Sequence, residues 1–121
     1  MKLPSESELL RIFIGEADKY EGKPLYEAIV HLARKKGMAG ATVLRGLMGF
    51  GADSRMHTAK ILRLSEDLPI IIEIVDELVK IEALLPELDH MIKEGLVTIE
   101  KARVIAYRYN QDKKQNLEKN D

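Results

Sequence analysis

The chain has 121 residues, 19 basic and 20 acidic side chains, a net charge of −1 and no cysteine. A chain of this length forms one domain that buries roughly 65% of the surface its unfolded form exposes. The lack of cysteine excludes disulfides, thiolate metal sites and cysteine nucleophiles. The balanced charge argues against nucleic acid as a partner. No apolar run reaches the length of a membrane span, and the first residues lack the apolar core of a signal peptide, so we expect a cytoplasmic protein without membrane insertion.

The residue usage also indicates a heat-adapted source. Residues 1–109 contain neither Asn nor Gln, and charged residues make up 32% of the whole chain. A bias towards Glu, Lys and Arg with few amide side chains is typical of proteins from thermophiles. We therefore expect a thermophilic origin.

The first half of the chain predicts a strand, a helix and a second strand. Residues 9–14 are rich in branched and aromatic side chains and are closed by Gly15, as in a strand. Pro24 suits a first helical turn, and apolar residues then recur at helical spacing until Gly37. Residues 40–47 complete this part as a second strand.

A long connection follows the second strand. Residues 47–68 are mostly polar and begin with Gly49-Phe50-Gly51, where a flexible backbone lets a ligand come close. A connection of this length in a small domain usually has a function. We interpret residues 47–68 as a ligand-responsive loop.

The third strand and second helix come next. The run at 69–75 is strongly apolar, and Asp76 is predicted to cap a helix that continues to Glu94 and stops at Gly95. Pro86 interrupts the helical pattern, so we expect either a kink or two short helices there.

The fourth strand completes the predicted domain. It takes residues 97–99 and 104–107, with a bend or break between them, and a polar tail follows at 110–121. The order strand, helix, strand, strand, helix, strand predicts an α+β, ferredoxin-like βαββαβ sandwich with a four-stranded antiparallel sheet. The predicted domain covers residues 1–109.

Both faces of the predicted sheet are apolar. A ferredoxin-like sheet has helices on one face only, so its strands should alternate apolar and polar residues. The runs 9–14 and 69–75 are instead apolar at nearly every position, interrupted by Arg11 and Glu73. An exposed patch of this size is exceptional for a soluble monomer, so we expect another subunit to cover it, most simply in a closed ring.

Several of these segments resemble known families. The matching residues are Gly40-Ala41-Thr42-Val43, Gly49-Phe50-Gly51, Pro69 and Ile72-Glu73-Ile74-Val75, and they resemble the PII signalling proteins in order and spacing. Residues 8 to about 108 also resemble a PII-like family, domain of unknown function 190, through IGEADKYEGKPLYEAIV, GATVLRGLMGFG and LPELDHMIKEGLVTIEKARV. The resemblance implies a homotrimer that binds an adenine nucleotide between the base of the long loop and the neighbouring subunit's loop before the last strand. It also implies signalling to a partner protein through the 47–68 loop, without catalysis.

The resemblance assigns candidate nucleotide-binding residues by position. They are Thr42, Gly49, Phe50, Gly51, Glu73, Val75 and Gly95, to which Ala52 and Arg45 are added as the residue after the glycine pair and as a substitute cation. The family's phosphate-binding lysine is replaced by Leu96, and Tyr107 and Tyr109 stand where the family has two arginines. These departures favour AMP or ADP over a triphosphate as the ligand.

Two other functions stay open. One is a small enzyme that acts on a nucleotide or small anion in the same clefts, although the sequence offers no catalytic constellation. The other is a metal-tolerance trimer like the CutA group. His31, His57 and His90 form no local metal motif, so we expect neither a catalytic residue nor a metal site.

Overall fold

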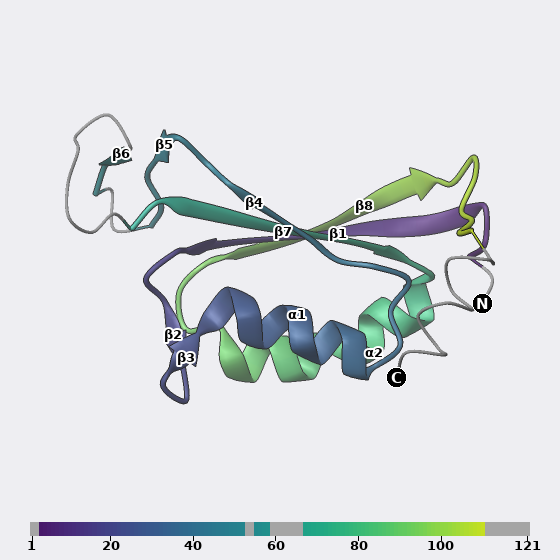
Figure 1. Ribbon diagram of the computed structural model, residues 1–121, viewed down its shortest axis with the longest axis horizontal. Coiled ribbons are helices and arrows are strands. Elements are labelled where there is room, and N and C mark those ends of the chain that lie inside the picture. Colours follow the sequence, from purple (N-terminus) through teal and green to yellow (C-terminus); the bar gives the residue numbers. More distant parts are fainter. Residues whose placement is uncertain (1–2, 53–54, 59–66, 111–121) are drawn as a thin grey trace.

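Figure 1 shows a layer of strands above two helices, with both helices on the same face of the sheet. The computed structural model describes residues 3–52, 55–58 and 67–110. The main elements are the strands β1 (Glu6–Gly15), β4 (Thr42–Arg45), β7 (Pro69–Asp76) and β8 (Leu96–Arg103) and the helices α1 (Leu25–Lys35) and α2 (Leu78–Met91). The four strands form an antiparallel sheet in the order β4-β7-β1-β8. The predicted ferredoxin-like fold is therefore confirmed.

Two short strand pairs were not predicted. β2 (Lys19–Tyr20) pairs with β3 (Lys23–Pro24) before α1, and β5 (Met48–Gly49) pairs with β6 (His57–Thr58) at the start of the long connection. Pro24 has φ −56° and ψ 130°, which is extended rather than helical backbone. It therefore precedes the helix, and the prediction that it occupies the first helical turn is wrong.

The boundaries of α2 also differ from the prediction. Asp76 stays in β7, buried, and its carboxylate accepts hydrogen bonds from the backbone N–H of Ala39 at 2.8 Å and of Glu77 at 2.7 Å. Glu77 is the N-cap, and the helix ends at Met91 instead of Glu94. The Asp76 side chain therefore links β7 to Ala39, in the connection between α1 and β4. It does not cap the first turn of α2.

Pro86 lies inside α2, which continues through it as one helix. Proline leaves the carbonyl four residues earlier without its helical donor. Here that residue is Glu82, and both it and Pro86 are exposed. Water can therefore hydrate the carbonyl, and the predicted division into two helices does not occur.

The last strand is longer and ends earlier than predicted. β8 passes through Glu100 and Lys101 without a break because each of its residues has a partner on β1, ending with Arg103 opposite Glu6. The predicted strand at 104–107 is wrong: beyond the start of β1, Val104 only donates one hydrogen bond to the carbonyl of Ser5, at 2.8 Å. Of the predicted tail at 110–121, residues 111–121 lie outside the described part of the chain.

One face of the sheet forms the core with the helices. Alternate residues of β1 and β7 are fully buried there against apolar side chains of α1 and α2. The largest buried residues are Leu10, Ile12, Ile72 and Ile74 from the strands and Ile29, Ile81, Leu84 and Leu88 from the helices, each at most 1% exposed.

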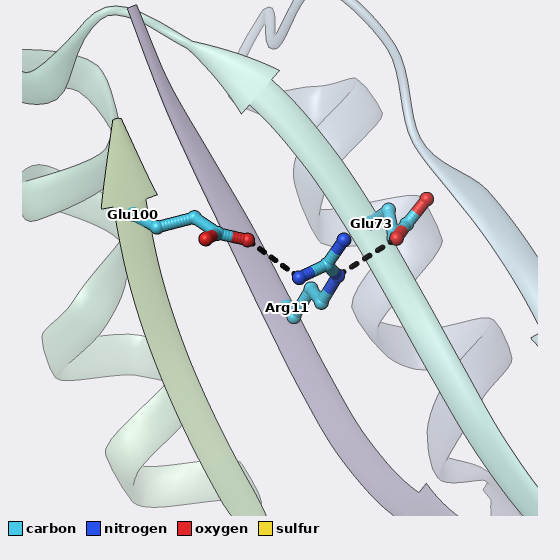
Figure 2. Close-up of polar contacts among 3 residues, drawn as sticks. All are labelled: Arg11, Glu73 and Glu100. Atoms are coloured by element: carbon cyan, nitrogen blue, oxygen red, sulfur yellow. Dashed lines mark hydrogen bonds and ion pairs between the residues drawn. The ribbon is translucent and has the colours of Figure 1, made fainter. Parts of the chain in front are cut away.

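The opposite face, which we call the open face, has no element of the described chain over it (Figure 1). The strand register places Leu9, Phe13, Leu44, Ile71, Val75 and Leu96 on it, with Leu44 and Leu96 45% and 56% exposed. Arg11 lies at its centre and is bound on both sides (Figure 2): Nε donates to Oε2 of Glu73 at 2.9 Å, and Nη1 to Oε1 of Glu100 at 2.5 Å. The predicted second apolar face is therefore present, interrupted by an ion-paired group on three adjacent strands.

Candidate functional site

A cleft of about 540 Å³ lies at the base of the long connection, and we call it the loop-base cleft. Its walls come from the end of β1, the residues around β5, the start of β7 and the turn before β8. Apolar side chains cover much of it, among them Phe13, Phe50 and Ile70. A cavity of this size with mainly apolar walls is typical of small-molecule sites.

Two glycines allow the walls to come this close together. A Cβ atom at Gly49 would lie 3.0 Å from Cγ of Pro69, and one at Gly95 would lie 2.7 Å from the carbonyl oxygen of Phe13. Any other residue at either position would push β5 or the turn before β8 away from its neighbour. The glycines therefore shape the cleft and expose backbone groups to it.

The turn after β1 holds the base of the connection in place. The N–H of Glu16 donates to the carbonyl of Leu68 at 2.9 Å, and the N–H of Ala17 donates to Oδ1 of Asp67 at 2.8 Å. The Glu16 carboxylate also binds the Arg45 guanidinium at the end of β4. Both strands that lead into and out of the connection are thus attached to one turn.

The structure divides the predicted site residues into two groups. Gly49, Phe50, Gly51, Ala52 and Gly95 all line the loop-base cleft. The prediction placed the loop before the last strand on a neighbouring subunit, whereas these residues meet within one chain. The described walls of the cleft come from one chain, and a site completed by a neighbouring subunit stays a prediction.

The second group lies elsewhere on the sheet. Thr42 is paired with Glu73 across β4 and β7, and Val75 is two residues further along β7, so all three belong to the open face. Glu73 is already bound to Arg11 through Oε2 (Figure 2), while its other carboxylate oxygen points away from the guanidinium. Arg45 does not line the cleft and is ion-paired with Glu16. A single chain therefore does not bring this group to the cleft.

Three acidic residues of the cleft were not predicted. Asp18, Asp67 and Glu94 line it, each from a different segment of the chain. Asp18 and Asp67 accept hydrogen bonds from the N–H groups of Gly15 and Ala17, at 2.9 Å and 2.8 Å. Since the three residues are far apart in sequence and belong to charged stretches, no local pattern pointed to them.

The central ion pair of the open face affects the ionisation of its arginine. The hydrogen bond that Arg11 donates to Glu73 is the largest influence, and together with the charge of Glu100 it raises the pKa of Arg11 against the opposing effect of desolvation. Arg11 therefore stays charged throughout the neutral range.

A second groove, of about 820 Å³, lies between α1, α2 and the β2–β3 hairpin. His31 and His90 line it, and His90 packs edge-on against Tyr20 with ring centroids 6.2 Å apart.

Among the described residues no three His, Asp or Glu side chains are grouped so that they could hold a metal ion. Nor does any described helix combine the length and apolar character needed to cross a membrane.

The fold is shared with PII-like proteins of known structure. CPII, a nitrogen regulatory PII-like protein from Thiomonas intermedia K12 solved with ADP, AMP and bicarbonate, matches 85% of this chain and 90% of its own, with a TM-score of 0.57 and 20% identity. The GlnK–ATP complex of B. subtilis matches 83% of this chain and 84% of its own, with a TM-score of 0.52 and 14% identity.

The sequence relatives are closer. A UPF0166 protein of Aquifex aeolicus is 38% identical over 100 residues, which cover 83% of this chain and 94% of the relative. A UPF0166 protein of Methanocaldococcus jannaschii is 39% identical over 95 residues, 78% of this chain and 87% of the relative. The sequence profile of the family DUF190, described as "Uncharacterized ACR", matches residues 7–104. The chain therefore belongs to the family DUF190, domain of unknown function 190.

Proposed function

We propose that this protein is a cytoplasmic PII-like regulatory protein that binds AMP or ADP at the base of the 47–68 loop and signals to a partner protein through that loop. The observation that carries the proposal is the meeting of Gly49, Phe50, Gly51, Ala52 and Gly95 in one cleft. Gly95 is more than forty positions away from the others in the sequence, yet the resemblance to PII proteins assigned it to the same ligand as Gly49, Phe50 and Gly51.

The chemistry of the cleft suits an adenine ring. The apolar walls can cover the faces of a purine, and the backbone beside the glycines can hydrogen-bond to its edge. Phe50 lines the cleft but is 67% exposed. Its ring can therefore be covered by a bound base, and a base in contact with Phe50 directly touches the loop.

That contact supplies the signalling mechanism. A ligand shifts a conformational equilibrium only if it binds one state better than another. The loop-base cleft includes residues 48–52 on one side of the connection and Asp67 and Pro69 on the other. A nucleotide between these two stems favours the loop conformation in which both contact it, and the partner protein recognises that conformation.

A homotrimer is part of the proposal. Burial of the open face against two further copies removes its exposed leucines from water. In such an assembly, the residues on the open face near Thr42 and Glu73 lie at subunit boundaries, where they can complete a neighbour's nucleotide site. No chemical reaction is required for this function.

Calorimetric titration of the purified protein with AMP, ADP, ATP and divalent metals tests the proposal. We expect AMP or ADP to bind without turnover, and Phe50→Ala to weaken that binding about tenfold through loss of base stacking. Met56→Ala, in the same connection but outside the cleft wall, is the matched control and should bind as the wild type does. Product formation would support the enzyme alternative, metal binding alone the CutA-like alternative, and absence of nucleotide binding would exclude the proposed role.

A further inference from the structure

The described wall of the loop-base cleft is acidic. Asp18, Asp67 and Glu94 contribute carboxylates to it, whereas none of the described lining residues is a lysine, arginine or histidine. Phosphate-binding sites normally present basic side chains or the N-terminus of a helix to the anion. Here a phosphate would face three carboxylates.

Two of these carboxylates are fixed in position. Oδ2 of Asp18 accepts from the N–H of Gly15, and Oδ1 of Asp67 accepts from the N–H of Ala17. The space around Asp67 is tight, since a Cβ atom at Gly15 would lie 2.7 Å from its Oδ1. Neither carboxylate can swing away from a ligand without losing a backbone hydrogen bond. Glu94, in contrast, is exposed at the rim.

The described cation at the end of β4 does not offset this charge. Arg45 is bound to Glu16 in the adjoining turn, so that pair adds no net positive charge to the cleft. Two like charges roughly 8 Å apart at a protein surface repel each other enough to change affinity several-fold. Each additional phosphate on a ligand in this cleft therefore increases the repulsion.

We propose that the carboxylates of Asp67 and Glu94 make the cleft selective for adenosine compounds with few phosphates, so that affinity falls from AMP to ADP to ATP. The inference rests on the proposed nucleotide site and specifies how that site chooses among ligands. Adenosine, which carries no phosphate, binds at least as tightly as AMP. The two acidic residues act as specificity determinants by opposing the longer phosphate chains.

The test is calorimetry of the intact protein with adenosine, AMP, ADP and ATP, each with EDTA so that no divalent cation neutralises the phosphates. We expect the Kd of ATP to exceed that of AMP by about tenfold at 50 mM salt. Salt screens repulsion between charges. The ratio should therefore shrink to about threefold at 300 mM salt.

Two variants assign the effect to the named residues. Glu94→Gln and Asp67→Asn should each lower the ATP-to-AMP ratio of Kd values about threefold, and the asparagine can still accept from the N–H of Ala17. Glu82→Gln removes the same charge at an exposed position of α2 outside the cleft and should leave the ratio unchanged.

The outcomes separate this inference from the proposed function. If ATP binds as tightly as AMP, if salt widens the difference, or if neither acidic variant changes the ratio, the selectivity inference is wrong while the nucleotide site stands. If no adenosine compound binds at either salt concentration, the proposed function fails and the inference fails with it.

Discussion

The two faces of the sheet are built from the same kinds of residue but have different surroundings. On the helix-covered face, Ile72 is fully buried. Its neighbour Ile71 points to the open face, where it is partly exposed and lies opposite Phe13 and Leu44. A strand with isoleucine on both sides presents an apolar surface on each face of the sheet. The difference shows that the helices of the described chain cover only one of these two apolar surfaces.

The largest expected effect comes from placing a charge on the open face. Ile71→Arg would bury an unpaired cation in the proposed subunit interface, which strongly disfavours association. We expect analytical ultracentrifugation at micromolar concentration to show a trimer for the wild type and a single-chain species for the variant. Val79→Arg adds the same charge on α2, at a side chain that is 73% exposed, and should remain trimeric. If the Ile71→Arg variant still sediments as a trimer, the open face is not the subunit interface.

A substitution on the helix-covered face should instead lower the folding stability and leave the assembly unchanged. Ile72→Ala leaves a cavity in the core and should lower the free energy of unfolding by about 2–5 kcal/mol. Guanidinium denaturation measures this loss, while sedimentation should still show the wild-type mass. Ile71→Ala is the matched substitution on the other face and should mainly weaken association. Equal effects of the two variants on both measurements would mean that the faces are not distinct.

The ion-paired centre of the open face should give a smaller effect. Arg11→Met leaves Glu73 and Glu100 without their shared counter-ion on an apolar surface. We expect the concentration needed for assembly to rise by up to about tenfold. Adding Glu73→Gln and Glu100→Gln removes the uncompensated charges and should restore most of the assembly. If the triple variant is as impaired as Arg11→Met, the charges are not the cause.

The Arg11 ion pair should contribute equally to folding stability across the neutral pH range. Its hydrogen bond to Glu73 raises the pKa of Arg11. Stability gained from a raised pKa is fully present below the unfolded-state value and is lost only when pH rises through the folded-state value. Both lie far above neutrality, so the difference in unfolding midpoint between wild type and Arg11→Met should be constant from about pH 6 to 9. A steep change within that range would show that another group titrates with it.

The smallest effect is expected on the outer side of the helices. Lys36 pairs with Glu87 at 2.7 Å between the ends of α1 and α2, and both side chains are about half exposed. Exposed pairs contribute about 0.2–1 kcal/mol, so Lys36→Ala should lower the free energy of unfolding by no more than that in guanidinium denaturation. Lys93→Ala, at an exposed position beyond α2, is the control. A loss above about 2 kcal/mol would mean that the pair has a larger structural role.

The order of elements could be predicted because apolar runs and glycines mark them locally. The boundaries failed where pairing between distant segments decides them. Glu100 and Lys101 look unlike a strand interior, but β1 holds them in the sheet. Conversely, residues 104–107 have strand-like side chains but no partner along β1, which begins at Glu6. In both cases pairing with β1, and not the strand propensity of the local sequence, decides where the strand runs.

Part of the candidate site could also be predicted from the sequence. The glycines of the loop base and Gly95 were identified through a family resemblance, and they do meet in one cleft. Sequence positions alone could not tell that Thr42 and Glu73 lie on another surface of the same chain. The acidic residues of the cleft went unnoticed because Asp18, Asp67 and Glu94 become neighbours only when three connections fold together.

The attachment of both loop stems to the turn after β1 has an evolutionary consequence. The N–H of Gly46 bonds to the carbonyl of Pro69 at 2.7 Å, and Glu16 bonds to Leu68 beside it, so the two ends of the connection are joined before the segment between them begins. Insertions, deletions or exchanges between residues 53 and 66 therefore leave these stem hydrogen bonds and the described wall of the cleft in place. Under the proposed function, changes confined to this stretch give relatives new binding partners while the residues around the nucleotide site stay the same.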